Sequence, residues 1–144
     1  MSVVIDASGL VALVADESDG PAVAARLEAW RQTGEAIHAP ELARYEIANA
    51  LARYAGAGKL TINDVREAWE VLEGLSIRFH ALIDGPAAVQ TALTLERRSA
   101  YDAAYLALAT ELDAQLWTLD GPLARNARQR GLPVRSLLDP PESR

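Results

Sequence analysis

The chain has 144 residues, of which 50% are hydrophobic and 24% are charged, as expected of one globular domain with its own core. It contains no cysteine, which excludes disulfides and thiolate metal sites and fits a reducing compartment. The formal net charge of −6 does not exclude a nucleic-acid partner, because nearly all of the 14 basic residues are arginines, which grip phosphates well.

Short apolar strands and helices alternate in the first half of the chain. The β-branched run at residues 3–5 predicts a buried parallel strand, and the helix that follows has Ser8 as its expected cap. A helix opened by Asp19-Gly20-Pro21, a strand at 37–39 and a helix over 42–55 come next. This alternation is typical of crossover units in a parallel sheet.

The same pattern continues to the end of the chain. The further elements are a helix from Thr61 to Gly74, a strand at 77–79, helices after Asp84 and over 101–112, a strand at 116–118, a helix after Asp120 and a strand at 134–136. We therefore expect an α/β fold with a central parallel sheet flanked by helices, in a single domain over residues 1–138 with a C-terminal tail over 139–144. The start lacks a basic, apolar leader and no apolar run reaches the roughly 18 residues of a bilayer span, so we expect a soluble, cytoplasmic protein.

Four acidic residues lie beside apolar segments, where an isolated carboxylate is costly unless a cation or hydrogen bonds compensate it. They are Asp6, Glu46, Asp102 and Asp120. Asp6 and Asp120 follow predicted strands, and ligands gather at the carboxyl ends of parallel strands. Carboxylates suit Mg²⁺ or Mn²⁺, whereas His38 and His80, expected at a strand end and in a loop, form no cluster for a softer metal. The acids predict a shared hard metal ion and phosphate chemistry.

Each acid also has a structural alternative, which the residues alone leave open. Asp6 and Asp120 could cap the helices that follow them, and Asp102 could be a first-turn acid favoured by the helix dipole. Glu46 fits the solvent face of a helix, although Asn49 shares that face and could place a polar group beside it.

The sequence blocks around these acids resemble the PIN-domain nuclease family, and in particular its VapC-type toxins. The blocks are Val-Ile-Asp-Ala-Ser at 4–8, Glu-Ile-Ala-Asn-Ala-Leu at 46–51, Tyr-Asp-Ala-Ala-Tyr-Leu-Ala-Leu-Ala at 101–109, and Thr-Leu-Asp at 118–120 followed by Leu123. Any one block is weak, but all of them in this order and at this spacing form a specific signature that covers nearly the whole chain.

The resemblance implies a set of acids around one or two Mg²⁺ or Mn²⁺ ions. Carried onto this chain, that set is Asp6, Glu46, Asp102 and Asp120. Ser8 and Thr118 match positions where the family often has a hydroxyl beside the acids. The implied activity is metal-dependent cleavage of RNA phosphodiester bonds by an activated water, with Glu46 either a ligand or the group that orients that water.

The resemblance also implies partners. These are an RNA substrate, with single-stranded or loop regions of tRNA or rRNA as candidates, a VapB-type antitoxin that often points an arginine into the acidic pocket, and a second copy in a homodimer. Candidate RNA contacts are Arg44, Arg97, Arg98, Arg125 and Arg128, although solubility and salt bridges are alternatives for each. Trp30, Tyr54 and Trp69 are candidates for dimer contacts or for the core.

Two other functions stay open. A non-catalytic RNA-binding or interaction module would use the acids only for a structural metal. A haloacid-dehalogenase-like phosphatase would use Asp6 as its nucleophile, but Ser8 stands where a second Asp would be, and Lys59 lies in a predicted loop. Dinucleotide binding is excluded because no Gly-x-Gly-x-x-Gly follows a strand.

Overall fold

The structure, a computed structural model, describes residues 1–96 and 100–140. In these ranges the strands form one parallel sheet in the order β3-β2-β1-β4-β5. The strands are β1 (Ser2–Ile5), β2 (Ala36–Pro40), β3 (Arg78–His80), β4 (Gln115–Thr118) and β5 (Val134–Ser136). The predicted α/β fold with a central parallel sheet is confirmed.

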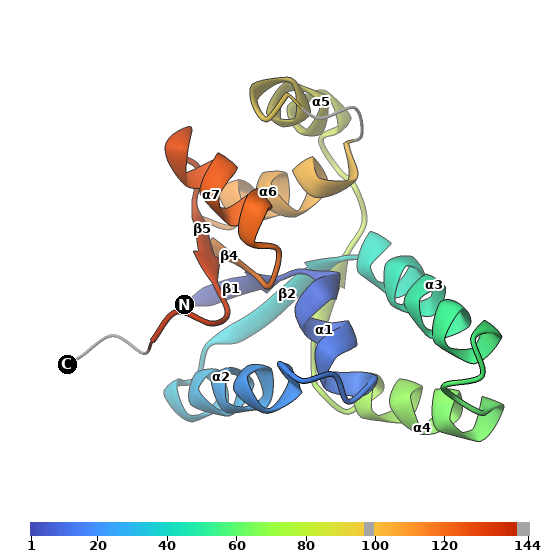
Figure 1. The fold of residues 1–144 in the computed structure, drawn as a ribbon. Helices are drawn as coiled ribbons and strands as arrows, with labels where there is room; N and C mark the ends of the chain where they lie inside the picture. The colour runs from blue at the N-terminus through green and yellow to red at the C-terminus, as the bar shows by residue number, and fades with distance from the viewer. Residues whose placement is uncertain (97–99, 141–144) are drawn as a thin grey trace.

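Helices cover both faces of this sheet (Figure 1). They are α1 (Ala7–Val14), α2 (Gly20–Thr33), α3 (Leu42–Gly56), α4 (Ile62–Glu73), α5 (Gly85–Thr94), α6 (Tyr101–Glu111) and α7 (Gly121–Gln129). Helices α6 and α7 pack on one face and α1 and α2 on the other, with α5 lying on α6 and with α3 and α4 beside α1. In the described part of the chain, every helix is too short or too polar to span a bilayer.

Strand β1 lies at the centre of the sheet and pairs with β2 and β4. Val4, Ile5 and Leu116 are completely buried, as expected of strands that are covered on both faces. Because the strands are parallel, their carboxyl ends meet at one edge of the sheet. Asp6 follows β1 there, and Asp120 follows the neighbouring strand β4.

Helix α1 begins earlier than the sequence predicts. Asp6 is its N-cap and accepts the backbone N–H of Gly9 at 3.4 Å, so the prediction of Ser8 as the cap was wrong. The chain turns into the helix directly after β1, which places Ser8 in the first turn instead. Glycine at position 9 lets this turn lie close to Leu137, because a Cβ on Gly9 would lie 2.5 Å from Cδ1 of Leu137.

The predicted aromatic contact residues belong largely to the core. Trp30 is buried and packs edge-on against Trp117, with 5.4 Å between ring centroids. Tyr54 and Trp69 are partly buried, and Trp69 packs against the core cluster.

Asp139, the first residue of the predicted tail, contacts the rest of the fold. Its carboxylate accepts the Arg128 guanidinium at 2.9 Å and the Ser136 backbone N–H at 3.1 Å, and its carbonyl accepts from Arg26. These contacts join α2, α7 and the end of β5.

Candidate active site

Asp6 is the most deeply buried of the predicted site acids, with 7% of its surface exposed. Its Oδ1 accepts the Ser8 hydroxyl at 2.5 Å, and its Oδ2 accepts the Thr118 hydroxyl. Behind these hydroxyls, the backbone N–H of Leu119 donates to Ser8 at 3.0 Å and that of Asp120 donates to Thr118 at 2.9 Å. Because each hydroxyl oxygen already accepts from the backbone, its proton is directed at the Asp6 carboxylate.

Burial dominates the electrostatics of Asp6. It raises the pKa of this carboxyl from 3.8 to about 6, against the opposing hydrogen bonds from Ser8, Thr118 and Gly9, and the charge of Asp120 raises it further. At neutral pH the carboxylate is therefore ionised in a site that favours its neutral form.

Asp120 combines both roles that its sequence position allows. Its Oδ1 accepts the backbone N–H of Leu123 at 2.9 Å, so it caps α7. It also lies near enough to Asp6 for its charge to oppose ionisation there. Capping and membership of an acidic site are thus compatible at this position.

Glu46 and Asp102 come from the helices α3 and α6. Glu46 is partly buried, and its Oε1 accepts the hydroxyl of Tyr105 at 2.6 Å, so it does not lie on a free solvent face. Burial raises the pKa of Glu46, the Tyr105 hydrogen bond lowers it, and the charge of Asp102 raises it. Asp102 lies in the first turn of α6, where the helix dipole favours an acid, and its charge still raises the pKa of Glu46.

The charges of the predicted acids and of Tyr105 act on one another. The charge of Asp120 raises the pKa of Asp6, that of Asp102 raises the pKa of Glu46, and those of Glu46 and Asp6 both raise the pKa of Tyr105. Within residues 1–96 and 100–140, neither Asp6, Glu46 nor Asp120 forms an ion pair with Arg or Lys. The charges of these three acids are therefore not balanced by an ion pair with an Arg or Lys of the described ranges.

These residues fit Mg²⁺ or Mn²⁺ in ligand type and charge, because the donors are carboxylate oxygens crowded with like charge. They do not converge fully: among the described side chains, no three of His, Cys, Asp and Glu lie close enough together to hold a metal ion. Mg²⁺ commonly keeps several waters and is held by one or two carboxylates, so two acids would be enough to hold it.

The candidate RNA-binding residues differ in how tightly they are held. The Arg44 guanidinium lies 4.2 Å from the Phe79 ring centroid and 2.7 Å from the Glu73 carboxylate, which fixes it between α3, α4 and β3. Asn49, the proposed neighbour of Glu46, is exposed, and its side chain forms no hydrogen bond in the described structure.

Helix α7 carries the other described candidates. Arg125 is exposed and folds back over the first turn, where a Cβ on Gly121 would lie 3.1 Å from its Nη1. Arg128 is paired with Asp139. Arg97 and Arg98 lie outside the described residues.

Sequence reasoning missed two contacts of titratable side chains. The sequence blocks include Tyr105 but do not predict its bond to Glu46, although its i+3 spacing from Asp102 places both on one face of α6. His38 and His80 were expected apart, but they lie on the neighbouring strands β2 and β3, with 2.7 Å between Nδ1 of His38 and Nε2 of His80. Strand register, which brings them together, has no local sequence signal.

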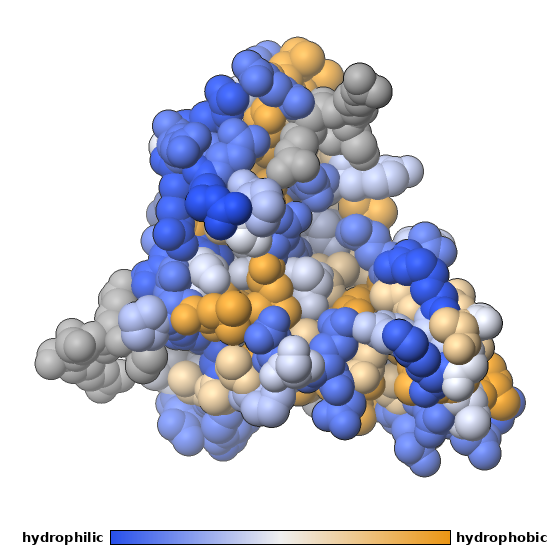
Figure 2. Space-filling model, viewed as in Figure 1, coloured by the Kyte–Doolittle hydropathy of each residue, from blue (hydrophilic) through white to orange (hydrophobic). Residues whose placement is uncertain are grey.

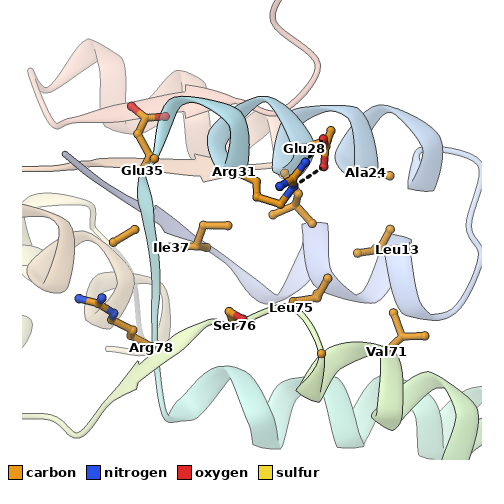
Figure 3. A pocket seen from close by; sticks show the side chains of 14 residues that line it. Leu13, Ala24, Glu28, Arg31, Glu35, Ile37, Val71, Leu75, Ser76 and Arg78 are labelled. Carbon is orange, nitrogen blue, oxygen red and sulfur yellow. Dashed lines mark hydrogen bonds and ion pairs between the residues drawn. The ribbon is translucent and has the colours of Figure 1, made fainter.

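A separate pocket of about 580 Å³ lies away from these acids (Figure 3). Its walls are mostly apolar and come from α1, α2, α4 and the starts of β2 and β3, with Leu13, Ile37 and Leu75 among the lining residues. The exposed ion pair of Glu28 and Arg31 stands at its rim. None of the predicted site acids lines this pocket.

The sequence matches the PIN domain family over residues 3–129. It is 36% identical over 131 residues to Ribonuclease VapC3 of Pyrobaculum aerophilum, covering 86% of this chain and 93% of that one. It is 37% identical over 124 residues to Ribonuclease VapC3 of Mycobacterium tuberculosis, covering 85% of each chain. The chain therefore belongs to the PIN-domain family. Within that family it is of the VapC type, as the blocks around the acids predict.

A solved structure shows the same fold. The crystal structure of PAE2754 from Pyrobaculum aerophilum matches with a TM-score of 0.68 at 24% identity, over 88% of this chain and 79% of that chain. The predicted PIN-like architecture is confirmed.

Proposed function

We propose that this protein is a metal-dependent endoribonuclease and the toxin of a VapBC-type toxin–antitoxin pair. The names of the two relatives support RNA as the substrate. The observation that carries the proposal is that Asp6 is buried and Glu46 partly buried, both with raised pKa values and no ion pair to Arg or Lys among the described residues. Such uncompensated charge is costly unless a cation binds to it.

The carboxylates have distinct roles in this proposal. Asp6 and Asp120 hold Mg²⁺ or Mn²⁺, with Asp102 and Glu46 as direct or water-bridged ligands. When bound, the ion supplies an acidified water and neutralises charge on the phosphodiester oxygens. The hydroxyls of Ser8 and Thr118 fix the orientation of Asp6, so that both of its oxygens keep one position while the substrate binds.

The substrate class follows from what surrounds the acids. Arg125 lies against Gly121, the residue after Asp120, and in this proposal it holds a phosphate of single-stranded or loop RNA, in tRNA or rRNA. Hydrophilic side chains cover the part of α7 that faces the viewer in Figure 2. Contacts of this kind position the backbone and carry no sequence specificity.

The proposed protein partners are a VapB-type antitoxin and a second copy of the chain. The acids would attract an arginine from the antitoxin, which would supply the cation that the described residues do not provide. In that state the toxin is inhibited, because the arginine occupies the place of the metal.

The test is cleavage of RNA by the purified protein with Mg²⁺ or Mn²⁺, followed by sequencing of the RNA ends. We expect discrete cut sites that disappear with EDTA and in Asp6→Asn. Asp19→Asn serves as the control and should cleave RNA normally, because Asp19 precedes α2 without a side-chain capping bond. Absence of cleavage, together with a loss of thermal stability in EDTA, would instead support the non-catalytic metal-stabilised module.

A further inference from the structure

Tyr105 is a buried phenol whose polar atom points at a proposed site acid. Only 3% of its surface is exposed, and its hydroxyl donates to Oε1 of Glu46 at 2.6 Å across a separation of 59 residues. The contact joins α6 to α3, and both of these helices also pack against β2. A buried hydroxyl needs a partner, and this one has a carboxylate.

The hydroxyl of Tyr105 repeats part of an arrangement seen at Asp6. There, a backbone N–H donates to a hydroxyl, and the hydroxyl donates to the carboxylate, through Ser8 and through Thr118. The phenol hydroxyl of Tyr105 likewise donates its proton to a carboxylate, that of Glu46.

Tyr105 also lies near Asp6. Helix α6, which carries Tyr105, packs against β1, and β1 ends directly before Asp6. The charge of Asp6 acts on the Tyr105 phenol, whose hydroxyl is bonded to the acid of α3. Burial, the Glu46 hydrogen bond and the charges of Glu46 and Asp6 all raise the pKa of Tyr105, so it stays a protonated donor.

We infer that Tyr105 is a positioning residue that holds Glu46 toward the Asp6 turn, so that the acid from α3 joins the metal site. The inference rests on the proposed function, with Glu46 as a direct or water-bridged ligand. Tyr105 touches neither metal nor RNA in this role. It acts through Glu46, as outer-shell donors do when they orient ligating carboxylates.

A purely structural role for Tyr105 makes a different prediction. If its ring only fills space between α6 and α1, then phenylalanine at this position keeps the packing and leaves metal binding unchanged. If the hydroxyl positions Glu46, then phenylalanine keeps the fold but frees the carboxylate to rotate away. Removing one oxygen atom therefore separates the two roles.

The experiment compares Tyr105→Phe with Tyr45→Phe, by electron paramagnetic resonance of free Mn²⁺ in titrations without RNA. Tyr45 precedes Glu46 on the same helix but is 73% exposed, so its variant removes the same atom without touching the proposed site. We expect Mn²⁺ affinity to fall about tenfold or more in Tyr105→Phe and to stay unchanged in Tyr45→Phe. Thermal unfolding of both variants, measured first, should show folded proteins.

A double-mutant cycle tests whether the effect passes through Glu46. In a Glu46→Gln background, Tyr105→Phe should cause no further loss of Mn²⁺ affinity. Should Tyr105→Phe not fold, Glu46→Asp withdraws the carboxylate from the phenol instead and should weaken Mn²⁺ binding to a similar degree.

The outcomes separate this inference from the proposed function. Normal Mn²⁺ binding by the unmodified protein with unchanged affinity in Tyr105→Phe overturns the inference alone, as does an equal loss in both backgrounds of the cycle. If the unmodified protein binds no Mn²⁺, the proposed function fails and the inference fails with it.

Discussion

Glu28 and Asp6 are carboxylates with opposite surroundings. Glu28 is exposed on α2 and receives two hydrogen bonds from Arg31, at 2.8 and 2.6 Å, which lower its pKa to about 2. Asp6 is buried at the edge of the sheet, is held by the hydroxyls of Ser8 and Thr118, and has its pKa raised to about 6. Glu28 is exposed to solvent and paired with a cation, whereas Asp6 is buried and has no ion pair among the described residues.

The difference shows what hydroxyl donors can and cannot do. Hydroxyls fix the orientation of a carboxylate, but they bring no positive charge, so they leave the cost of burying its charge largely in place. An arginine at the same position would neutralise Asp6 and would also occupy the place of a metal. A site built from hydroxyls is therefore oriented and still able to bind a cation.

The largest expected effect separates two acids that share a capping role. Asp120 and Asp84 each precede Gly-Pro and cap a helix with a 2.9 Å bond to a backbone N–H. Asp120→Asn should lose RNA cleavage by a hundredfold or more, on the order expected for a group that acts directly in metal-assisted hydrolysis. Initial rates of cleavage with Mn²⁺ measure the effect.

Asp84→Asn is the matched control for this prediction. Its capping loss should be of similar size, about 1 kcal/mol or less, and its cleavage rate should stay normal. Equal cleavage by both variants would mean that Asp120 is only a helix cap and takes no part in cleavage.

The next effect concerns the hydroxyl that serves Asp6 from β4. Thr118 is completely buried, donates to Asp6 and accepts the backbone N–H of Asp120. Thr118→Val keeps the shape but leaves both partners unsatisfied, so the free energy of unfolding should fall by about 2 to 3 kcal/mol. Denaturant titration measures this loss, and Thr110→Val, which removes a hydroxyl of an exposed residue bonded within α6, should change it by less than about 0.5 kcal/mol.

A smaller effect of the opposite sign is expected at Asp6 itself. Because folding raises its pKa, its contribution to stability is complete below the unfolded value of 3.8 and is lost as the pH rises through about 6. In EDTA, the free energy of unfolding of Asp6→Asn relative to that of the native chain should therefore increase by about 1 to 2 kcal/mol between pH 4 and pH 7.5. Denaturant titrations at pH 7.5 and pH 4 measure the gain and its disappearance at the lower pH.

Glu28→Gln provides the contrasting variant. Its carboxylate is stabilised by Arg31, so removal of its charge should give no gain at pH 7.5. A gain of equal size in both variants would show that general charge repulsion, and not the burial of Asp6, decides the result.

The sequence could predict the sheet and the acids at its edge because their signals are local. Strands β1 and β4 are short apolar runs, and Asp6 and Asp120 follow them directly, so parallel pairing alone brings these acids together. The metal ligation that the resemblance implies stays a prediction.

Contacts between distant elements could not be predicted in the same way. The Tyr105 bond to Glu46 depends on how α6 and α3 are placed around the sheet, and the pairing of His38 with His80 depends on the register of β2 and β3. The wrong cap at Ser8 has a similar cause, because Asp6 becomes the cap in a turn where Gly9 lies close to Leu137, a residue far away in the sequence. Each is a result of three-dimensional packing without a periodic or local signal.

The smallest expected effect lies at the histidine pair, on the other half of the sheet. Burial lowers the pKa of His38, and the charges of His80 and Arg78 lower it further. Since the folded protein disfavours the charged form, this histidine contributes stability above its unfolded pKa of about 6.5 that is lost as the pH falls toward the folded value. Relative to His38→Gln, the native chain should lose about 1 kcal/mol or less between pH 7 and pH 5.5.

Asp6 acts in the opposite direction over much of this pH range, so the effect of His38→Gln must be measured in an Asp6→Asn background. In that background residue 6 does not titrate. If His38→Gln then reduces the pH dependence of the free energy of unfolding, that part of the dependence comes from the histidine pair. If the difference between the two curves is flat between pH 7 and pH 5.5, then His38 is not held neutral by its surroundings. In that case burial opposes the charge of the carboxylate after β1 but not that of the histidine on β2, although Nε2 of His38 has no hydrogen-bond partner in the described structure.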